Sequence, residues 1–330
     1  MRLMILVLIG SLTHLATPAA AQTPREIAIA TGGIELAATL TLPNGNGPHP
    51  AILLLSGSGP STRGNLNKFS EQLIAEGFAT LAYDKRGVGA STGSWMSASF
   101  EDNVTDAVAA LTRLREEAGV DPRRLGVWGV SQAGWFIPAI TARVPDLAFA
   151  IVLTGGGATP REVEMFMHEA SLEGAGATPS ERVRARELLN TYFAWLGSGN
   201  GRQDVVNLIA RASAEPWYKA IAIDGVMPSE ANRPNWEWVA LYDPLPLIEK
   251  MTLPTLVVLG GDDRMGSPTV AAERWRTGLH KAGNARATVV IIPGMGHAAT
   301  IGATHAQGGA VMPEYTRTVA AFLSPIKLAP

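Results

Sequence analysis

The sequence contains no cysteine. The stability of the fold therefore cannot rest on disulfides, and a chain of 330 residues can bury a core large enough not to need them. Lipid attachment to a cysteine behind a signal peptide is excluded as well. Because the chain also has no His-Glu-x-x-His motif and no cluster of cysteine and histidine, the sequence gives little support for a metal site.

Charge is sparse, and neither sign is in excess. Charged residues make up 17% of the chain, and 27 Lys and Arg stand against 29 Asp and Glu, for a net charge of −2. Nucleic acid and anionic membrane surfaces are therefore poor candidates for partners. Hydrophobic residues make up 46%, which indicates a globular protein with a large core. A small or apolar neutral ligand fits this composition better.

No apolar run reaches the roughly 20 residues that span a bilayer. The chain begins with a short positive start, Met1-Arg2, then a mostly apolar stretch over 3–15 and three alanines at 19–21. This order is typical of a cleaved signal peptide, which we expect to comprise residues 1–21. The alternative, a permanent membrane anchor, is disfavoured by the length of the apolar stretch. We expect a mature chain without a membrane span that starts near Gln22 and resides in the periplasm or is secreted.

Short apolar runs without alternation are interleaved with segments of helical periodicity. Runs of this kind suit strands covered on both faces, as in a parallel sheet. After a hairpin over residues 26–42, the expected strands cover 51–55, 79–83, 125–128, 148–153, 255–259 and 287–292. The expected helices between and after them cover 69–76, 102–117, 135–143, 269–282 and 315–323. The pattern predicts an α/β protein with a mostly parallel, doubly wound sheet.

The middle of the chain, residues 161–250, has a different character. It holds no strand-like run, contains helical stretches such as 180–196, and carries Trp195, Trp217, Trp236 and Trp238, half of the eight tryptophans. We interpret it as a helical insertion between two strands of the sheet. The sheet domain then consists of residues 22–160 and 251–330.

The most informative motif is residues 129–134, Gly-Val-Ser-Gln-Ala-Gly, between an apolar strand and a helix. A nucleophile on such a turn adopts a strained backbone and needs small neighbours so that strand and helix approach closely. Gly129 and Ala133 occupy those positions, although the usual pattern has glycine at the second. Ser131 is the candidate nucleophile. Alone, the string also fits an ordinary strand-to-helix turn, so its context matters.

A second loop fits an oxyanion hole. Residues 55–60, Leu-Ser-Gly-Ser-Gly-Pro, follow an earlier strand, where a hydrolase needs backbone N–H groups to hold the oxyanion. We expect the amides of Ser58 and Gln132 to form this pair. A dinucleotide-binding loop is the competing interpretation, but the third glycine of that fingerprint is missing and Pro60 is poorly placed to open a helix. Binding of a dinucleotide cofactor by this loop is therefore not expected.

A candidate carboxylate and a candidate base follow Ser131 along the chain, each in a loop after a late strand. Asp262 and Asp263 lie after one late strand, and His297 lies after the next. Serine is a weak nucleophile at neutral pH, so it requires an adjacent imidazole, which a carboxylate orients. His305, in the glycine-rich segment beyond, is the only serious competitor for the role of base. The other histidines are interpreted as surface or structurally satisfied residues: His14, His49, His168 and His280.

Residues 83–91, Tyr-Asp-Lys-Arg-Gly-Val-Gly-Ala-Ser, resemble the D-x-R-G-x-G-x-S turn of α/β-hydrolases. The similarity is strongest to esterase-like and peptidase-like bacterial members that carry a Ser-Gly-Ser-Gly-Pro loop, and it covers residues 51–153 and 253–298. The resemblance implies the α/β-hydrolase fold, a cap over the site and no cofactor. It also implies that Asp263 rather than Asp262 serves the histidine, and that the turn from Asp84 to Ser91 is structural.

These observations predict a serine hydrolase that cleaves carboxylic esters of short to medium acyl chain through an acyl-enzyme. Ser131, Asp263 and His297 are its expected catalytic residues. One alternative is an exported peptidase or thioesterase of the same fold. A peptidase would need a cap carboxylate for the amino terminus of its substrate, and four are available: Glu164, Glu173, Glu215 and Glu237. A catalytically inactive binding protein is the non-enzyme alternative. The sequence does not indicate an oligomeric state.

Overall fold

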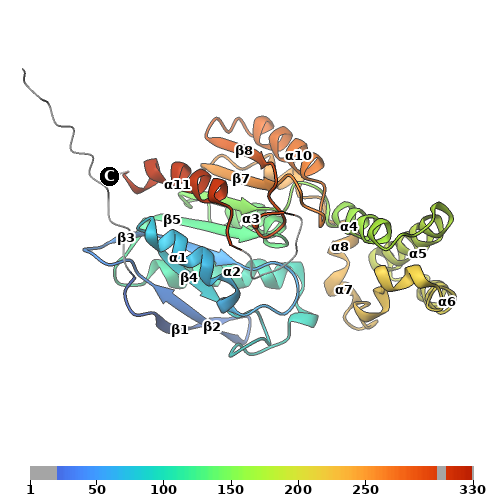
Figure 1. Ribbon diagram of the computed structural model, residues 1–330. Helices are drawn as coiled ribbons and strands as arrows, with labels where there is room; N and C mark the ends of the chain where they lie inside the picture. The colour runs from blue at the N-terminus through green and yellow to red at the C-terminus, as the bar shows by residue number, and fades with distance from the viewer. Residues whose placement is uncertain (1–20, 303–309, 329–330) are drawn as a thin grey trace, which may run out of the picture.

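The computed structural model describes residues 21–302 and 310–328. They form one eight-stranded sheet with helices on both faces and a separate helical unit beyond one end of the strands (Figure 1). The strand order is β1-β2-β4-β3-β5-β6-β7-β8. Pairing is antiparallel from β1 to β2 and from β2 to β4, and parallel across the rest of the sheet. The predicted mostly parallel, doubly wound sheet is confirmed. The predicted signal peptide, apart from Ala21, lies outside the described residues.

The elements follow the predicted order along the chain. The strands are β1 Arg25–Thr31, β2 Ile34–Thr41, β3 His49–Leu55, β4 Ala79–Tyr83, β5 Val120–Val130, β6 Phe149–Leu153, β7 Thr255–Gly260 and β8 Ala287–Ile292. The helices of the sheet domain are α1 Asn67–Ala75, α2 Phe100–Arg115, α3 Ala133–Arg143, α10 Pro268–Lys281 and α11 Pro313–Lys327. Strand β5 begins earlier than the predicted 125–128. Its polar first half lacks an apolar pattern, yet it extends beside β3 with an irregular register.

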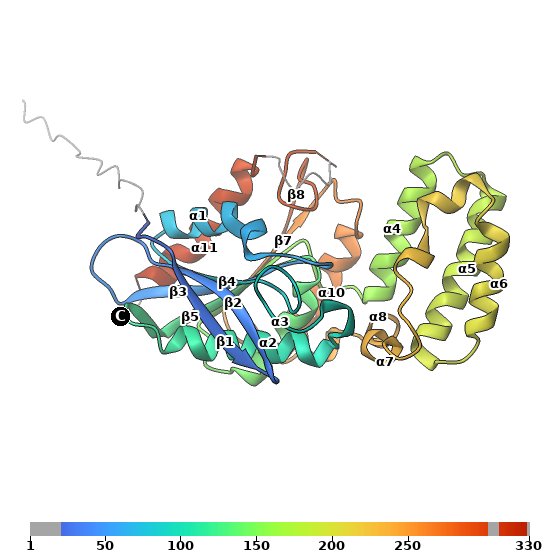
Figure 2. The same ribbon diagram turned by 90° about the horizontal axis from the view of Figure 1, so that it is seen from below.

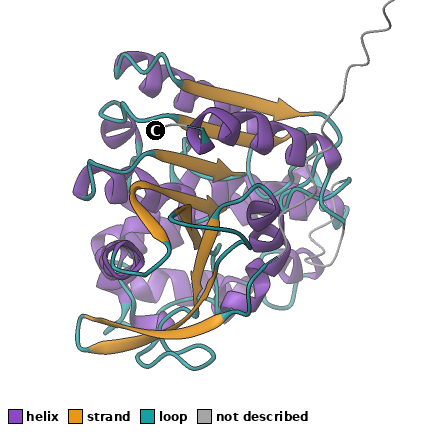
Figure 3. Cartoon of the chain, turned by 90° about the vertical axis from the view of Figure 1, so that its left-hand side faces the viewer, coloured by secondary structure: helices purple, strands orange, loops and turns teal. Residues whose placement is uncertain are grey.

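Burial explains why the central strands read as continuous apolar runs. Every residue of β6 and β7 is buried, because α1 and α11 cover one face of the sheet and α2, α3 and α10 cover the other (Figure 2). The edge strand β1 alternates between exposed and buried residues instead. The sheet twists along its width, with the β1–β2 hairpin at one edge (Figure 3) and β8 at the other.

A helical unit connects β6 to β7, in the part of the chain where the sequence predicts a helical insertion, and it is called the cap below. Its helices are α4 Pro160–Gly174, α5 Pro179–Ser198, α6 Arg202–Ala212, α7 Arg233–Trp236, α8 Trp238–Leu241 and α9 Leu245–Ile248. Both α4 and α5 start with a threonine that caps the helix, a proline in the first turn and a glutamate that bonds back to the threonine. The cap encloses its own apolar core around Leu188, Trp195 and Trp217. No helix in the described ranges is long and apolar enough to cross a membrane.

Aromatic contacts attach the cap to the sheet domain. The Trp238 ring on α8 lies 5.9 Å from Trp135 and 5.7 Å from Phe136, both on α3. The Trp236 indole N–H donates to the Met96 carbonyl oxygen at 2.7 Å. Because α3 begins directly after the predicted nucleophile, these contacts hold the base of the cap beside it.

Candidate active site

A cavity of about 690 Å³ lies between the cap and the carboxyl ends of the strands. This is where open α/β sheets bind their ligands. The sheet domain lines it through loops that follow β3, β5, β6, β7 and β8, with Ser58, Gly59, Ser131, Gln132, Thr154, Gly155, Gly156, Asp263 and His297. All five residues proposed for catalysis and the oxyanion hole therefore meet in one cavity.

Ser131 occupies a strained turn between β5 and α3. Its φ angle is +56°, in the left-handed region that residues with a side chain rarely adopt. The turn is held by a hydrogen bond from the Ser131 N–H to the Leu153 carbonyl at 2.9 Å. A Cβ atom on Gly129 would lie 2.6 Å from the Cβ of Ala133, so only one of these two positions can carry a methyl group. Ala133, which stands where the usual motif has its second glycine, therefore fits because Gly129 has no side chain.

The start of α3 also packs against the loop after β6, which the sequence analysis did not single out. A Cβ on Gly134 would approach the Gly155 carbonyl carbon to 2.5 Å, and one on Gly155 would approach the backbone carbonyl oxygen of Ser131 to 2.0 Å. Gly134 and Gly155 therefore let two loops meet directly at the nucleophile. The feature of the sequence that could have indicated this close contact is the run of three glycines at 155–157, immediately after a predicted strand.

The structure places Asp263, and not Asp262, against His297. The Asp263 Oδ2 atom lies 2.8 Å from the His297 Nδ1 atom, and its side chain is only 6% exposed. The other oxygen of Asp263, Oδ1, accepts a hydrogen bond from the Met265 N–H at 2.8 Å. Asp262 is exposed. The Thr154 hydroxyl donates to the His297 carbonyl oxygen and so helps to hold the histidine loop. The competing His305 lies outside the described residues.

Ser58 and Gln132 both border the cavity. Within residues 21–302 and 310–328, neither backbone N–H has a hydrogen-bond acceptor, so both are available to a bound oxyanion. The loop after β3 passes directly over the nucleophile, because a Cβ on Gly57 would lie 3.2 Å from the Ser131 Cβ. Two unpaired amides beside a serine are the arrangement that an acyl-transfer site requires.

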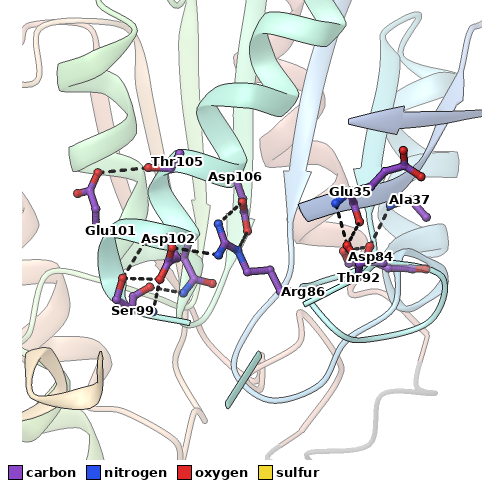
Figure 4. A network of polar contacts seen from close by, with 12 residues as sticks. Glu35, Ala37, Asp84, Arg86, Thr92, Ser99, Glu101, Asp102, Thr105 and Asp106 are labelled. Carbon is purple, nitrogen blue, oxygen red and sulfur yellow. Dashed lines mark hydrogen bonds and ion pairs between the residues drawn. The ribbon is translucent and has the colours of Figure 1, made fainter. Parts of the chain in front are cut away.

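The turn that carries the α/β-hydrolase resemblance joins three elements through buried polar contacts (Figure 4). Asp84 accepts hydrogen bonds from the Arg63 side chain at 2.6 Å and from the Ala90 N–H at 3.0 Å. Arg86 binds Asp106 on α2 through two nitrogens, at 2.6 and 2.8 Å. None of these four side chains lines the large cavity. Their contacts fit the structural role that the resemblance implies.

A polar pair on α4 faces the cavity. Glu164 and His168 are four residues apart on the helix, with 3.8 Å between Oε2 and Nε2, and both line the cavity. The surrounding protein removes enough water to raise the pKa of Glu164 to about 7 and to lower that of His168 to about 4. His168 was interpreted as a surface or satisfied residue, and the structure places it in the wall of the cavity beside Glu164. Helical periodicity alone does not tell which face a cap helix turns toward the sheet.

The four cap tryptophans divide evenly. Trp236 and Trp238 line the cavity, whereas Trp195 and Trp217 are buried in the core of the cap. Met and aromatic residues of the sheet domain, including Trp95 and Trp135, complete the apolar wall. Among the described residues, no three His, Asp or Glu side chains lie together as ligands of a metal ion would.

Comparison with known proteins agrees with this architecture. The esterase Pf2001 of Pyrococcus furiosus superposes with a TM-score of 0.58 at 15% identity, over 92% of this chain and 90% of that one. Proline iminopeptidase of Mycobacterium smegmatis superposes with a TM-score of 0.59 at 19% identity, over 92% and 99%. At such identities the likeness concerns the fold, which is that of α/β-hydrolases.

Curated proteins that are related in sequence include a quorum-quenching protein and an esterase. The quorum-quenching protein AidA of Acinetobacter baumannii is 30% identical over 131 residues, which is 39% of this chain and 43% of AidA. Esterase EstD of Thermotoga maritima is 24% identical over 231 residues, 68% of this chain and 49% of EstD. The chain thus spans less than half the length of these relatives. Residues 32–294, most of the chain, match the profile of a single family. This protein therefore belongs to the X-Pro dipeptidyl-peptidase (S15) family.

Proposed function

We propose that this protein is a serine hydrolase that cleaves small carboxylic esters through an acyl-enzyme. The observation that carries the proposal is the 2.8 Å contact between His297 Nδ1 and Asp263 Oδ2 in the cavity that Ser131 also lines. A buried carboxylate on Nδ1 leaves the other ring nitrogen, Nε2, free to accept the serine proton.

In the acylation step, the Ser131 oxygen attacks the carbonyl carbon of the ester while its proton moves to His297. The carbonyl oxygen becomes an anion, which the Ser58 and Gln132 N–H groups bind. Collapse of this intermediate breaks the bond to the alcohol, which leaves with the proton from His297. The acyl group remains on Ser131.

In the deacylation step, a water molecule attacks the acyl carbon and gives its proton to His297. A second tetrahedral anion forms in the same two amides, and its collapse returns the proton to Ser131. The carboxylic acid is released and the enzyme is restored.

The cavity favours an apolar acyl or alcohol group of modest size. Its volume of about 690 Å³ lies within the range of small-ligand sites, and Trp236, Trp238 and Trp135 contribute to its wall. Each methylene that a substrate buries there contributes up to about 0.8 kcal/mol of binding. Two of the proteins compared above, EstD and Pf2001, are named as esterases.

One observation favours peptide hydrolysis as a second candidate. Of the four cap carboxylates considered for binding an amino terminus, only Glu164 lines the cavity. A carboxylate at that place suits a substrate with a positive amino group. The family profile and the iminopeptidase fold relative are both named for peptidases that act on proline-containing substrates.

Export to the periplasm or the medium is part of the proposal. It rests on the order of positive, apolar and small residues in the first 21 positions. Mass spectrometry of the protein from its native host is expected to find an amino terminus near Gln22. An intact Met1-Arg2 terminus would exclude cleavage.

The function is tested by labelling and by a substrate series. A fluorophosphonate is expected to label the wild-type protein on Ser131 and to leave Ser131→Ala unlabelled, whereas an inactive binding protein would not react. With p-nitrophenyl esters, kcat/KM is expected to rise with acyl length until the cavity is full. Peptide amides and thioesters are assayed alongside. A flat ester profile together with faster cleavage of amino-terminal peptide amides would assign the peptidase function instead.

A further inference from the structure

Lys85 follows β4 and directs its side chain into the space between the loop after β3 and the start of α3. Its ammonium group donates one hydrogen bond to the Gly57 carbonyl oxygen and another to the Gln132 side-chain oxygen, the latter at 3.0 Å. The first acceptor belongs to the peptide that carries the Ser58 N–H. The second belongs to the residue that supplies the other proposed oxyanion amide. One side chain therefore contacts both halves of the oxyanion hole.

The geometry of the peptide bond gives this contact a consequence. In a planar trans peptide the C=O and the N–H point in opposite directions. Because the Gly57 carbonyl points toward the Lys85 ammonium, the Ser58 N–H points away from it. A Cβ on Gly57 would be 3.2 Å from the Ser131 Cβ, so this peptide lies directly beside the nucleophile. A rotated peptide would present its carbonyl oxygen to the substrate anion and repel it.

We propose that Lys85 is a positioning residue of the oxyanion hole, which holds the Gly57–Ser58 peptide and Gln132 in the orientation that binds the tetrahedral anion. The inference rests on the proposed function. Lys85 does not line the large cavity, and it acts through the two amides rather than on the substrate itself.

The surroundings of Lys85 distinguish it from the residues on either side. Asp84 and Arg86 form the ion pairs that hold the turn together, whereas within the described residues Lys85 has no carboxylate partner and is bound by two neutral oxygens. Burying a charge without an opposite charge beside it costs free energy, and hydrogen bonds to neutral oxygens offset only part of that cost. Lys85 bridges the Gly57–Ser58 peptide and the Gln132 side chain, and a role in positioning these two groups gives a reason for a buried charge at this place.

Burial lowers the pKa of Lys85 to about 8. Tyr83, Arg86 and Asp106 are the titratable side chains that share the small cavity beside it, and Arg86 and Asp106 are bonded to each other. The ammonium form prevails below pH 8, so both hydrogen bonds are strongest there. They weaken as the pH rises through the pKa of Lys85.

The experiment compares Lys85→Met, Lys85→Arg and the control Lys281→Met. Lys281 is an exposed lysine on α10, paired with Glu249 at 2.8 Å. The main readout is the second-order rate constant for phosphonylation of Ser131 by a fluorophosphonate. This reaction also develops a negative oxygen in the hole and does not depend on the identity of the substrate. Ester kcat and KM, and thermal unfolding, are measured on the same samples.

We expect Lys85→Met to lower the phosphonylation rate and kcat by about 100-fold, the lower end of the loss that follows removal of one oxyanion donor, with little change in KM. Lys281→Met is expected to match the wild type. Lys85→Arg is expected to retain most of the activity. The wild-type rate is expected to fall above about pH 8, whereas Lys85→Arg is expected to stay active at higher pH because the arginine pKa exceeds 12.

A folded Lys85→Met protein that reacts at the wild-type rate would overturn the assignment, and so would an alkaline decline that is unchanged in Lys85→Arg. The comparison of the pH profiles of the wild type and Lys85→Arg tests the proposal even if Lys85→Met does not fold. A wild-type protein that reacts with neither fluorophosphonate nor ester would refute the proposed function itself, and that result is distinct from equal rates in reactive wild type and variant.

Discussion

Replacing Asp263 by asparagine should disable the site by imposing the wrong tautomer on His297. In the structure, Oδ1 of Asp263 accepts from the Met265 N–H at 2.8 Å, and Oδ2 faces His297 Nδ1 at 2.8 Å. An asparagine keeps the first bond only if its oxygen faces Met265. Its NH₂ group then faces Nδ1, which must give up its proton and become an acceptor. The proton moves to Nε2, where it blocks transfer from Ser131.

The size of the effect follows from what the carboxylate contributes. The same substitution in a well-studied serine protease lowers kcat by about 10⁴-fold through the wrong tautomer, which corresponds to about 5.5 kcal/mol of transition-state stabilisation. We expect a loss of that order here, because the Asp263 side chain is only 6% exposed and its geometry leaves no room for the other orientation without a clash of two donors.

The assay is the hydrolysis of a p-nitrophenyl ester, with fluorophosphonate labelling as a second measure and circular dichroism as the test of folding. Asp262→Asn is the matched control, since it makes the same chemical change in an exposed neighbour and should leave kcat unchanged. Activity of Asp263→Asn within tenfold of the wild type would refute the tautomer argument. Loss of activity in Asp262→Asn alone would transfer the role to that residue.

Three further predictions follow from the site. Ser131→Ala and His297→Ala should each lower kcat by about 10⁶-fold without a change in the unfolding temperature. A variant whose kcat stays close to the wild-type value would show that the replaced residue does not have the role assigned to it. The ratio of kcat/KM for an amino-bearing ester to that for its neutral analogue should rise as the pH passes about 7, where the carboxyl of Glu164 loses its proton, and should be flat in Glu164→Gln. A flat ratio in the wild type would exclude Glu164 as a cation site. Gly129→Ala should lower the free energy of unfolding by about 1–3 kcal/mol through overpacking, as measured by urea titration, whereas Gly174→Ala, whose Cβ meets nothing within 4 Å, should not destabilise the protein.

Local patterns in the sequence were enough to predict the sheet and the order of the chemistry. The buried strands β3, β4, β6 and β7 are short and mostly apolar without alternation, and that pattern follows directly from their cover on both faces. Ser131 was predictable because a strained turn requires small residues at fixed spacing beside it. Those requirements act between near neighbours, so they leave a signature in the sequence.

Other features depended on contacts between segments far apart in the chain. The sequence offered Asp262 and Asp263 equally, and the resemblance to α/β-hydrolases favoured Asp263; only the packing of the β7 loop on the β8 loop shows which carboxylate is buried against His297. Likewise, no pattern separates Glu164 from the other cap glutamates, because the orientation of α4 is set by its contacts with the rest of the cap and with the sheet domain.

Lys85 illustrates the limit most clearly. In the sequence it stands between Asp84 and Arg86, in a turn whose apparent purpose is structural. Its two acceptors, on Gly57 and Gln132, lie 28 and 47 residues away, and they come together only because β3 lies between β4 and β5 in the sheet. The sequence by itself determined which elements form and which residues can do chemistry. The tertiary structure decided which of those residues meet, because side-chain direction and burial are set by packing between distant elements.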